Sequence, residues 1–143
     1  MKIFFSGPLT NLKDPGKTKA FYMKLDTVAA RLGYDTFWAF RSGTDPIQNP
    51  DVTPKEVYLR DINELKTSNL MIAYVGEAST GTGVEIEYAR QHSLPVVLLF
   101  EKNRKVSRMA RGCPSVVKEI QCTTEEDACA QMEQYLTDFK KQL

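Results

Sequence analysis

Two acidic residues stand where a carboxylate could do chemistry. Glu85 lies two positions after the glycine-containing stretch STGTG (79–83), near the start of a predicted helix. Asp61 lies within the apolar stripe of another predicted helix, so its side chain is expected to face inward. A buried carboxylate without a cationic partner has a raised pKa, which makes it a candidate acid, base or nucleophile.

Each carboxylate also has a purely structural interpretation. Glu85 could stabilise the first turn of its helix, because an acidic side chain interacts favourably with the helix dipole. Asp61 could accept a hydrogen bond from the backbone of a neighbouring loop. Both alternatives remain open from these two residues alone.

Together, two carboxylates in an otherwise uncharged pocket suit the cleavage of a glycosidic bond. One attacks the anomeric carbon or stabilises an oxocarbenium ion, and the other transfers the proton. His92 is the single histidine and lies late on its helix, so Ser-His-Asp and Cys-His arrangements have no second candidate base. No His/Cys cluster offers metal ligands. We therefore expect a reaction without metal or cofactor.

The elements that must position these residues alternate between strand and helix. Strands are predicted at 2–6, 34–40, 69–75, 95–100 and 116–122, and helices near 16–32, 54–67, 83–92, 105–111 and 124–141. Capping boxes at 53–56 and 123–126 mark two helix starts. This alternation predicts a single α/β domain over 1–143, a Rossmann-like, five-stranded parallel sheet of flavodoxin-like order 2-1-3-4-5 with helices on both faces.

The strand order locates a site. Ligands of such sheets bind beyond the carboxyl ends of the first and third strands, where this chain has the loops SGPLTN (6–11) and GEASTGTG (76–83). Neither loop matches a dinucleotide fingerprint or a P-loop. The segment 41–52 is the longest without a pattern, long enough for a binding loop or lid, and pocket residues are expected from 37–51.

Composition limits the partners. The net charge of +1 gives no reason to expect nucleic acid or an anionic membrane, and no apolar run approaches the roughly 18 residues of a membrane span. The start MKIFFSGPLT is broken by Gly-Pro too early for a signal peptide. Cys113, Cys122 and Cys129 have neither C-x-x-C spacing nor an even count. We expect a cytoplasmic protein with free thiols.

Four motifs carry a family resemblance. FFSGPLTN (4–11), RDINEL (60–65), STGTGVEIEYA (79–89) and SRMARG (107–112) resemble, in order along nearly the whole chain, the nucleoside 2-deoxyribosyltransferase superfamily, specifically its 2'-deoxynucleoside 5'-phosphate N-hydrolases. The resemblance implies that Glu85 is the nucleophile, forming a glycosyl-enzyme ester, and that Asp61 assists proton transfer and orients the sugar. It also implies a homodimer in which the neighbouring subunit supplies Ser107 and Met109.

The same resemblance implies a set of substrate-binding residues. They are Phe4, Gly7, Pro8, Leu9, Thr10, Ser79, Gly81, Ser107 and Met109. Ser79 replaces an aspartate that binds the free 5'-hydroxyl in the transferases, and a neutral hydroxyl suits a phosphate dianion. Pro8 and Thr10 instead stand where the hydrolases often have serine and arginine, and Gly-Pro-Leu (7–9) is closer to the transferases. Phe4 replaces a tyrosine beside the sugar, which implies access for ribonucleotides, although core packing would also explain a phenylalanine.

Three functions follow as hypotheses. The first is hydrolysis of a nucleoside 5'-monophosphate to free base and sugar 5-phosphate. The second is transfer of the sugar to another base, and the third is a sensor domain that binds a nucleotide without cleaving it.

Overall fold

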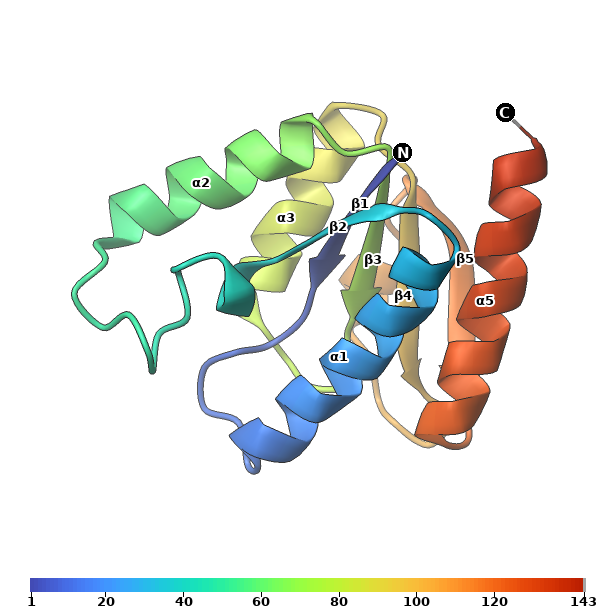
Figure 1. The fold of residues 1–143 in the computed structure, drawn as a ribbon, viewed down its shortest axis with the longest axis horizontal. Helices are drawn as coiled ribbons and strands as arrows, with labels where there is room; N and C mark the ends of the chain where they lie inside the picture. Colours follow the sequence, from blue (N-terminus) through green and yellow to red (C-terminus); the bar gives the residue numbers. More distant parts are fainter. Residues whose placement is uncertain (143) are drawn as a thin grey trace.

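The computed structural model describes residues 1–142 and contains one parallel sheet. Its strands are β1 (Lys2–Ser6), β2 (Asp35–Trp38), β3 (Leu70–Tyr74), β4 (Val96–Glu101) and β5 (Val116–Cys122), in the order β2-β1-β3-β4-β5. The fold class and strand order predicted from the sequence are therefore confirmed. β1 lies between β2 and β3, so the chain reverses its winding direction at the β1–β3 pair (Figure 1).

Helices cover both faces of the sheet. They are α1 (Pro15–Arg31), α2 (Pro54–Lys66), α3 (Thr80–Gln91), α4 (Arg108–Arg111) and α5 (Glu125–Lys141), with a 3₁₀ turn, η1 (Ala39–Arg41), after β2. α1 and α5 pack on one face, and α2 and α3 pack on the other (Figure 1). No helix within residues 1–142 is long and apolar enough to cross a membrane.

Alternation along the buried strands divides the core between the two faces. Phe5 and Ile72 point toward α1 and α5, whereas Phe4 and Met71 point toward α2 and α3. Successive side chains of a strand face opposite ways, so a strand covered on both faces is apolar throughout. All five residues of β3 are buried, as its uninterrupted apolar sequence indicates.

The predicted capping box of α2 is confirmed, whereas that of α5 was placed one residue early. Thr53 caps α2 reciprocally with Glu56, and proline begins the helix. At α5 the cap is Thr124, whose side chain accepts from the Asp127 N–H, and Asp127 in turn accepts from the Thr123 N–H. Aspartate thus takes the place that the sequence pattern assigned to Glu126, because either acid can accept these hydrogen bonds.

α3 begins three residues earlier than predicted. Ser79 caps it by accepting a hydrogen bond from the Thr82 N–H, and Thr80 is the first helical residue. The stretch STGTG is therefore a cap and the first helical turn rather than a loop, because a serine cap outweighs the low helix propensity of glycine there. Glu85 lies in the second turn, and the first turn contains no acidic residue. The helix-dipole explanation of Glu85 was wrong.

Candidate active site

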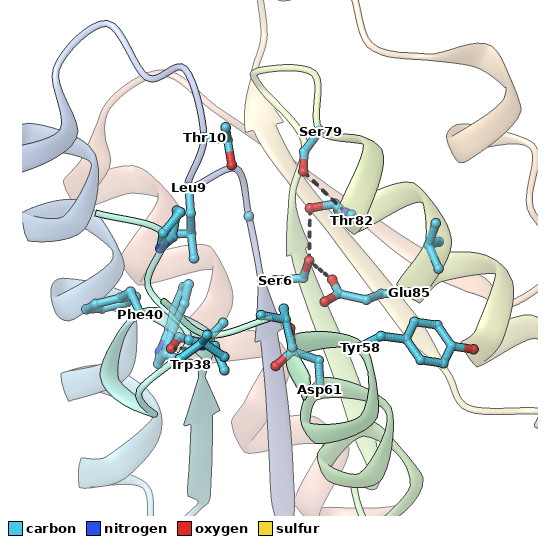
Figure 2. A pocket seen from close by; sticks show the side chains of 18 of the residues that line it. Ser6, Leu9, Thr10, Trp38, Phe40, Tyr58, Asp61, Ser79, Thr82 and Glu85 are labelled. Atoms are coloured by element: carbon cyan, nitrogen blue, oxygen red, sulfur yellow. Dashed lines mark hydrogen bonds between the residues drawn. The ribbon is translucent and has the colours of Figure 1, made fainter. Parts of the chain in front are cut away.

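A cavity of about 470 Å³ opens beyond the carboxyl ends of β1 and β3 (Figure 2). Its lining comes from the end of β1 and the following loop, the β2–α2 connection, α2 and the start of α3. The apolar part of the lining includes Leu9, Trp38, Phe40, Pro46, Pro50, Val52, Val57 and Tyr58. The cavity lies where the strand order predicts a ligand site.

Asp61 and Glu85 are the only charged residues that line this cavity among the described residues. Asp61 comes from α2 and Glu85 from α3, and both carboxylates face the space beside Ser6 (Figure 2). Leu9 and Phe40 lie across the cavity from Glu85. The fold thus brings the two predicted carboxylates together, although they are separated in the chain by the whole of β3.

Burial perturbs both carboxylates. It raises the pKa of Glu85 to about 8, an effect that a hydrogen bond from Ser6 opposes and the nearby charge of Asp61 reinforces. It also raises the pKa of Asp61 to about 6, although Arg60 partly offsets this. The Oδ1 atom of Asp61 is buried and has no hydrogen-bond partner among the described residues. An unpartnered buried acceptor is costly in a structural role and is expected where a ligand binds.

Two hydroxyl groups that sequence reasoning missed contact the Glu85 side of the site. Ser6 Oγ donates a hydrogen bond to Glu85 Oε2 and lies 3.0 Å from Thr82 Oγ1. Both residues are almost fully buried. The sequence contained a partial signal, because Ser6 ends a strand at the predicted site and Thr82 belongs to the STGTG stretch. Their contact depends on how α3 packs against β1.

Five of the predicted substrate-binding residues line the cavity with the carboxylates. They are Gly7, Leu9, Thr10, Ser79 and Gly81. Gly7 packs so closely on α1 that an added Cβ would lie 2.4 Å from the Tyr22 hydroxyl oxygen. Pro8 does not line the cavity, and its carbonyl accepts a hydrogen bond of 2.9 Å from that hydroxyl. Tyr22 therefore holds the β1–α1 loop at the cavity edge.

Phe4 also lies away from the cavity. Its side chain is 1% exposed and stacks on Phe37 with ring centroids 5.1 Å apart, within the core beneath α2 and α3. Its neighbours in the strand, Phe5 and Ser6, are the β1 residues that line the cavity. Core packing thus accounts for the phenylalanine.

Ser107 and Met109 line a second cavity, of about 510 Å³, on the other side of the start of α3. Ser107 caps α4, and Met109 is 87% exposed. Within one chain neither residue lines the cavity that contains Glu85, whereas Ser79 and Thr82 line both cavities. Lys105 brings a positive charge to the second cavity, and Glu77 and Glu87 bring negative charges.

The β2–α2 connection forms one wall of the first cavity. It contributes seven lining residues: Ala39, Phe40, Thr44, Pro46, Asn49, Pro50 and Val52. Asp45 is fully buried behind this wall, accepts hydrogen bonds from the N–H groups of Ile47 (2.8 Å) and Gln48 (3.1 Å), and pairs with Lys19 of α1. The unpatterned segment is thus an anchored wall, consistent with a binding loop.

The histidine and the three cysteines lie outside the first cavity. His92 caps the end of α3 at the surface and stacks on Tyr88. The three cysteines are free, as predicted. Within residues 1–142 no group of three or more His, Cys, Asp or Glu side chains is arranged to hold a metal ion.

Sequence comparison finds four significant curated relatives, and no family model matches the chain. A protein of Methanosarcina mazei, provisionally named 2'-deoxynucleoside 5'-phosphate N-hydrolase 1, is 33% identical over 92 residues, which are 64% of this chain and 55% of that protein. A protein of Thermofilum pendens with the same provisional name is 40% identical over 63 residues, 43% of this chain and 44% of that protein. The alignments span about half the length of these relatives.

Structure comparison extends the likeness to nearly the whole chain. The CMP N-glycosidase BcmB of Clostridium botulinum superposes with a TM-score of 0.72 at 20% identity, over 94% of this chain and 99% of that one. A 2-deoxyribosyltransferase of Bacillus psychrosaccharolyticus gives a TM-score of 0.67 at 19% identity, over 92% and 96% of the two chains. The resemblance predicted from the motifs is confirmed: over about half of their length the chain is similar to proteins named 2'-deoxynucleoside 5'-phosphate N-hydrolases, and it has the fold of the superposed CMP N-glycosidase and 2-deoxyribosyltransferase.

Proposed function

We propose that the protein is an N-glycosidase that hydrolyses nucleoside 5'-monophosphates, of the ribo or deoxyribo series, to free base and sugar 5-phosphate. The observation that carries this proposal is the pair Asp61 and Glu85, two carboxylates of raised pKa in a cavity whose other lining residues are uncharged. Homology to proteins named N-hydrolases supports it.

In the first step the Glu85 carboxylate bonds to the anomeric carbon as the glycosidic C–N bond breaks. The electron pair of that bond leaves with the base, which takes the proton of the Asp61 carboxyl group. In the second step a water oxygen bonds to the anomeric carbon, the ester breaks, and Glu85 leaves as a carboxylate. The proton released by the water passes to Asp61, which restores the starting state.

Each end of the substrate has a fitting part of the site. The first turn of α3, at Ser79 and Gly81, offers backbone N–H groups and a neutral hydroxyl to the 5'-phosphate. The side chains of Trp38 and Phe40, across the cavity from Glu85, offer apolar surface to the nucleobase. The sugar between them would place its anomeric carbon near Glu85, so phosphate and nucleophile act on opposite ends of one sugar.

The negative charge of the site favours a binding site that is completed by residues of a second subunit. A phosphate dianion near two carboxylates needs positive or hydrogen-bonding groups, yet no described Lys, Arg or His lines the first cavity. In a homodimer, Ser107 and Met109 of one subunit would complete the site of the other. Their exposure within one chain supports this arrangement.

Transfer of the sugar to a second base is the alternative activity. The residues Gly7, Pro8 and Leu9 match the transferases, and the same glycosyl-enzyme would react with a base in place of water. Incubating a deoxynucleoside, and separately its 5'-monophosphate, with a different free base separates the two activities. A transferase yields the exchanged nucleoside, whereas the proposed hydrolase releases base from the monophosphate and yields no exchanged product. A sensor that binds without cleavage would not need two inward carboxylates.

The direct test is a panel of the common ribo- and deoxyribonucleoside 5'-monophosphates, with released base quantified by chromatography. We expect release from at least one nucleotide, together with one equivalent of sugar 5-phosphate. The same panel of nucleosides without phosphate is the matched control. Intact nucleotides that nevertheless bind would support the sensor instead.

A further inference from the structure

The end of β1 places a buried hydroxyl group against the Glu85 carboxylate. Ser6 is 5% exposed, and its Oγ donates a hydrogen bond to Glu85 Oε2, 79 residues further along the chain. The same Oγ lies 3.0 Å from the hydroxyl oxygen of Thr82, which is 4% exposed. Three side chains from β1 and α3 therefore form a continuous row of hydrogen bonds (Figure 2).

The direction of these hydrogen bonds follows from counting protons. When Glu85 is ionised, as its attack requires, Ser6 gives its single hydroxyl proton to Glu85, so the Ser6 oxygen accepts from Thr82. The row therefore runs from Thr82 to Ser6 to Glu85. Thr82 is itself held in place, because its backbone N–H donates to the Ser79 cap at 3.3 Å. Aligned hydrogen bonds in a buried row polarise and strengthen one another.

We propose that Ser6, supported by Thr82, is a positioning residue for Glu85: it holds the carboxylate by Oε2 and leaves Oε1 free to face the substrate. This inference rests on the proposed nucleophilic role of Glu85. Ser6 touches Glu85 and acts through it.

Ser6 also influences where the proton of the carboxylate pair resides. With a pKa of about 8 for Glu85 and about 6 for Asp61, the pair holds one proton between these two values. Glu85 can attack only when that proton is on Asp61. A hydrogen bond donated to a carboxylate favours its ionised form, so Ser6 shifts the proton toward Asp61.

Other groups around Asp61 and Glu85 do not replace the effect of Ser6 on the pKa of Glu85. On α2 the titratable or charged neighbours of the pair are Tyr58, Arg60 and Glu64, of which Arg60 and Glu64 act on Asp61. The residues of the β2–α2 connection that line the cavity carry no charge, and β1 contributes Ser6 itself. Ser6 is thus the group that acts on Glu85 without acting directly on Asp61.

The test compares Ser6→Ala with Ser6→Cys, a variant of similar shape and weaker donor strength. We expect Ser6→Ala to lower kcat by about tenfold or more with KM within about twofold of wild type, and Ser6→Cys to lie between. Because the pair must hold one proton, the pH profile of kcat is bell-shaped, and its alkaline limb reports mainly Glu85. In Ser6→Ala that limb should move to higher pH by about one unit.

Thr82 supplies a second, independent perturbation of the same row. Thr82→Val removes the hydroxyl and keeps the branched shape, so it should move kcat and the alkaline limb in the same directions as Ser6→Ala, by a smaller amount. Thr82→Ser returns a hydroxyl and should recover most of the loss. A fall in kcat without movement of the alkaline limb in either series would show that Ser6 is merely structural.

A measurement without substrate separates this inference from the proposed function. The titration of the Glu85 carboxyl carbon by NMR, assigned with Glu85→Gln, should move to higher pH in Ser6→Ala whether or not a nucleotide is cleaved. An unchanged titration overturns the positioning role. A shifted titration in a protein that cleaves no nucleotide would show that Ser6 does act on Glu85. It would also overturn the hydrolase proposal and, with it, the catalytic use of Ser6.

Discussion

At the scale of single residues, the site depends on what surrounds its two carboxylates. Glu85 and Glu87 lie on the same helix, yet burial raises the pKa of Glu85 to about 8, whereas hydrogen bonds from Arg90 and Gln91 lower that of Glu87 to about 2. Position relative to the cavity therefore decides whether a glutamate is an ordinary surface charge or a group that titrates near neutral pH.

Replacing Glu85 with glutamine tests the nucleophile. The amide keeps the shape but cannot attack as a carboxylate, so base release should fall by about three orders of magnitude or more while nucleotide binding persists. Single-turnover base release and equilibrium binding measure the two properties separately. Activity within tenfold of wild type would exclude a covalent role for Glu85.

The same substitution should alter the pH dependence of stability. A carboxyl group whose pKa is raised in the folded protein contributes stability below its unfolded pKa and loses it as pH rises through the folded value. Glu85→Gln should therefore raise Tm relative to wild type at pH 9 and change it little at pH 5. Glu87→Gln is the control on the same helix, and it should give no gain at pH 9 because its folded pKa is lowered.

Substitutions of Ser79 test whether the start of α3 binds the phosphate. Aspartate and asparagine both keep an acceptor for capping, so Ser79→Asp adds a charge and Ser79→Asn serves as the neutral control. The added carboxylate should repel the phosphate of a nucleotide and accept a hydrogen bond from the free 5'-hydroxyl of a nucleoside. The nucleotide-to-nucleoside ratio of kcat/KM should fall by roughly a hundredfold or more for Ser79→Asp and by less than about tenfold for Ser79→Asn. If Ser79→Asp and Ser79→Asn had the same nucleotide-to-nucleoside ratio of kcat/KM, the phosphate would bind elsewhere.

At the scale of elements, the cavity depends on how an irregular segment is held. The β2–α2 connection has little regular structure after η1, and a flexible wall would define a pocket poorly. Burial alone would raise the pKa of Asp45, but hydrogen bonds from Lys19, Ile47 and Gln48 lower it. The carboxylate thus stays ionised and ties the wall to α1.

Asp45→Ala should loosen this wall. It leaves Lys19 and two backbone N–H groups without their acceptor, so we expect a loss of about 2 to 4 kcal/mol in the free energy of unfolding at pH 7, measured in urea. Because binding depends on the wall, KM should rise more than kcat falls. Asp45→Asn keeps an oxygen acceptor and should lose less stability. The contribution of Asp45 should also diminish as pH falls, since its lowered pKa stabilises the fold above the unfolded value.

At the scale of the whole molecule, the two cavities on either side of α3 support the proposed homodimer. Ser79 and Thr82 line both cavities, and exposed apolar side chains surround the region, with Tyr58 at 52%, Val84 at 47% and Met109 at 87% exposure. A second subunit that covers this surface would remove apolar area from water and bring α4 toward the neighbouring site.

Mixing two disabled variants tests the proposed dimer. Glu85→Gln disables the nucleophile, and Ser107→Asp adds a charge that repels phosphate. After subunit exchange, a heterodimer contains one site with both native residues, so an equimolar random mixture should recover about one quarter of wild-type activity, because half of the dimers are heterodimers with one intact site each. Sedimentation should show a dimer. Activity that equals the mean of the two separate variants would mean that each chain builds its own site.

Local pattern was sufficient to predict much of the architecture. Helical periodicity predicted that Asp61 faces inward, and the pairing of Thr53 with Glu56 predicted the start of α2. The strand order predicted a site beyond β1 and β3. These features could be read from the sequence because they follow from interactions within one or two turns, or from a general rule of parallel sheets.

The tertiary structure decided the details that give the site its chemistry. The Ser79 cap makes α3 begin earlier than the sequence pattern predicts, and the side chain of Phe4 lies in the core. Packing of α3 against β1 brings Ser6 into contact with Glu85, 79 residues away in the chain. Packing also separated Ser107 and Met109 from the first cavity within one chain. Contacts between distant residues depend on how whole elements dock, and a local pattern of side chains contains no measure of that docking.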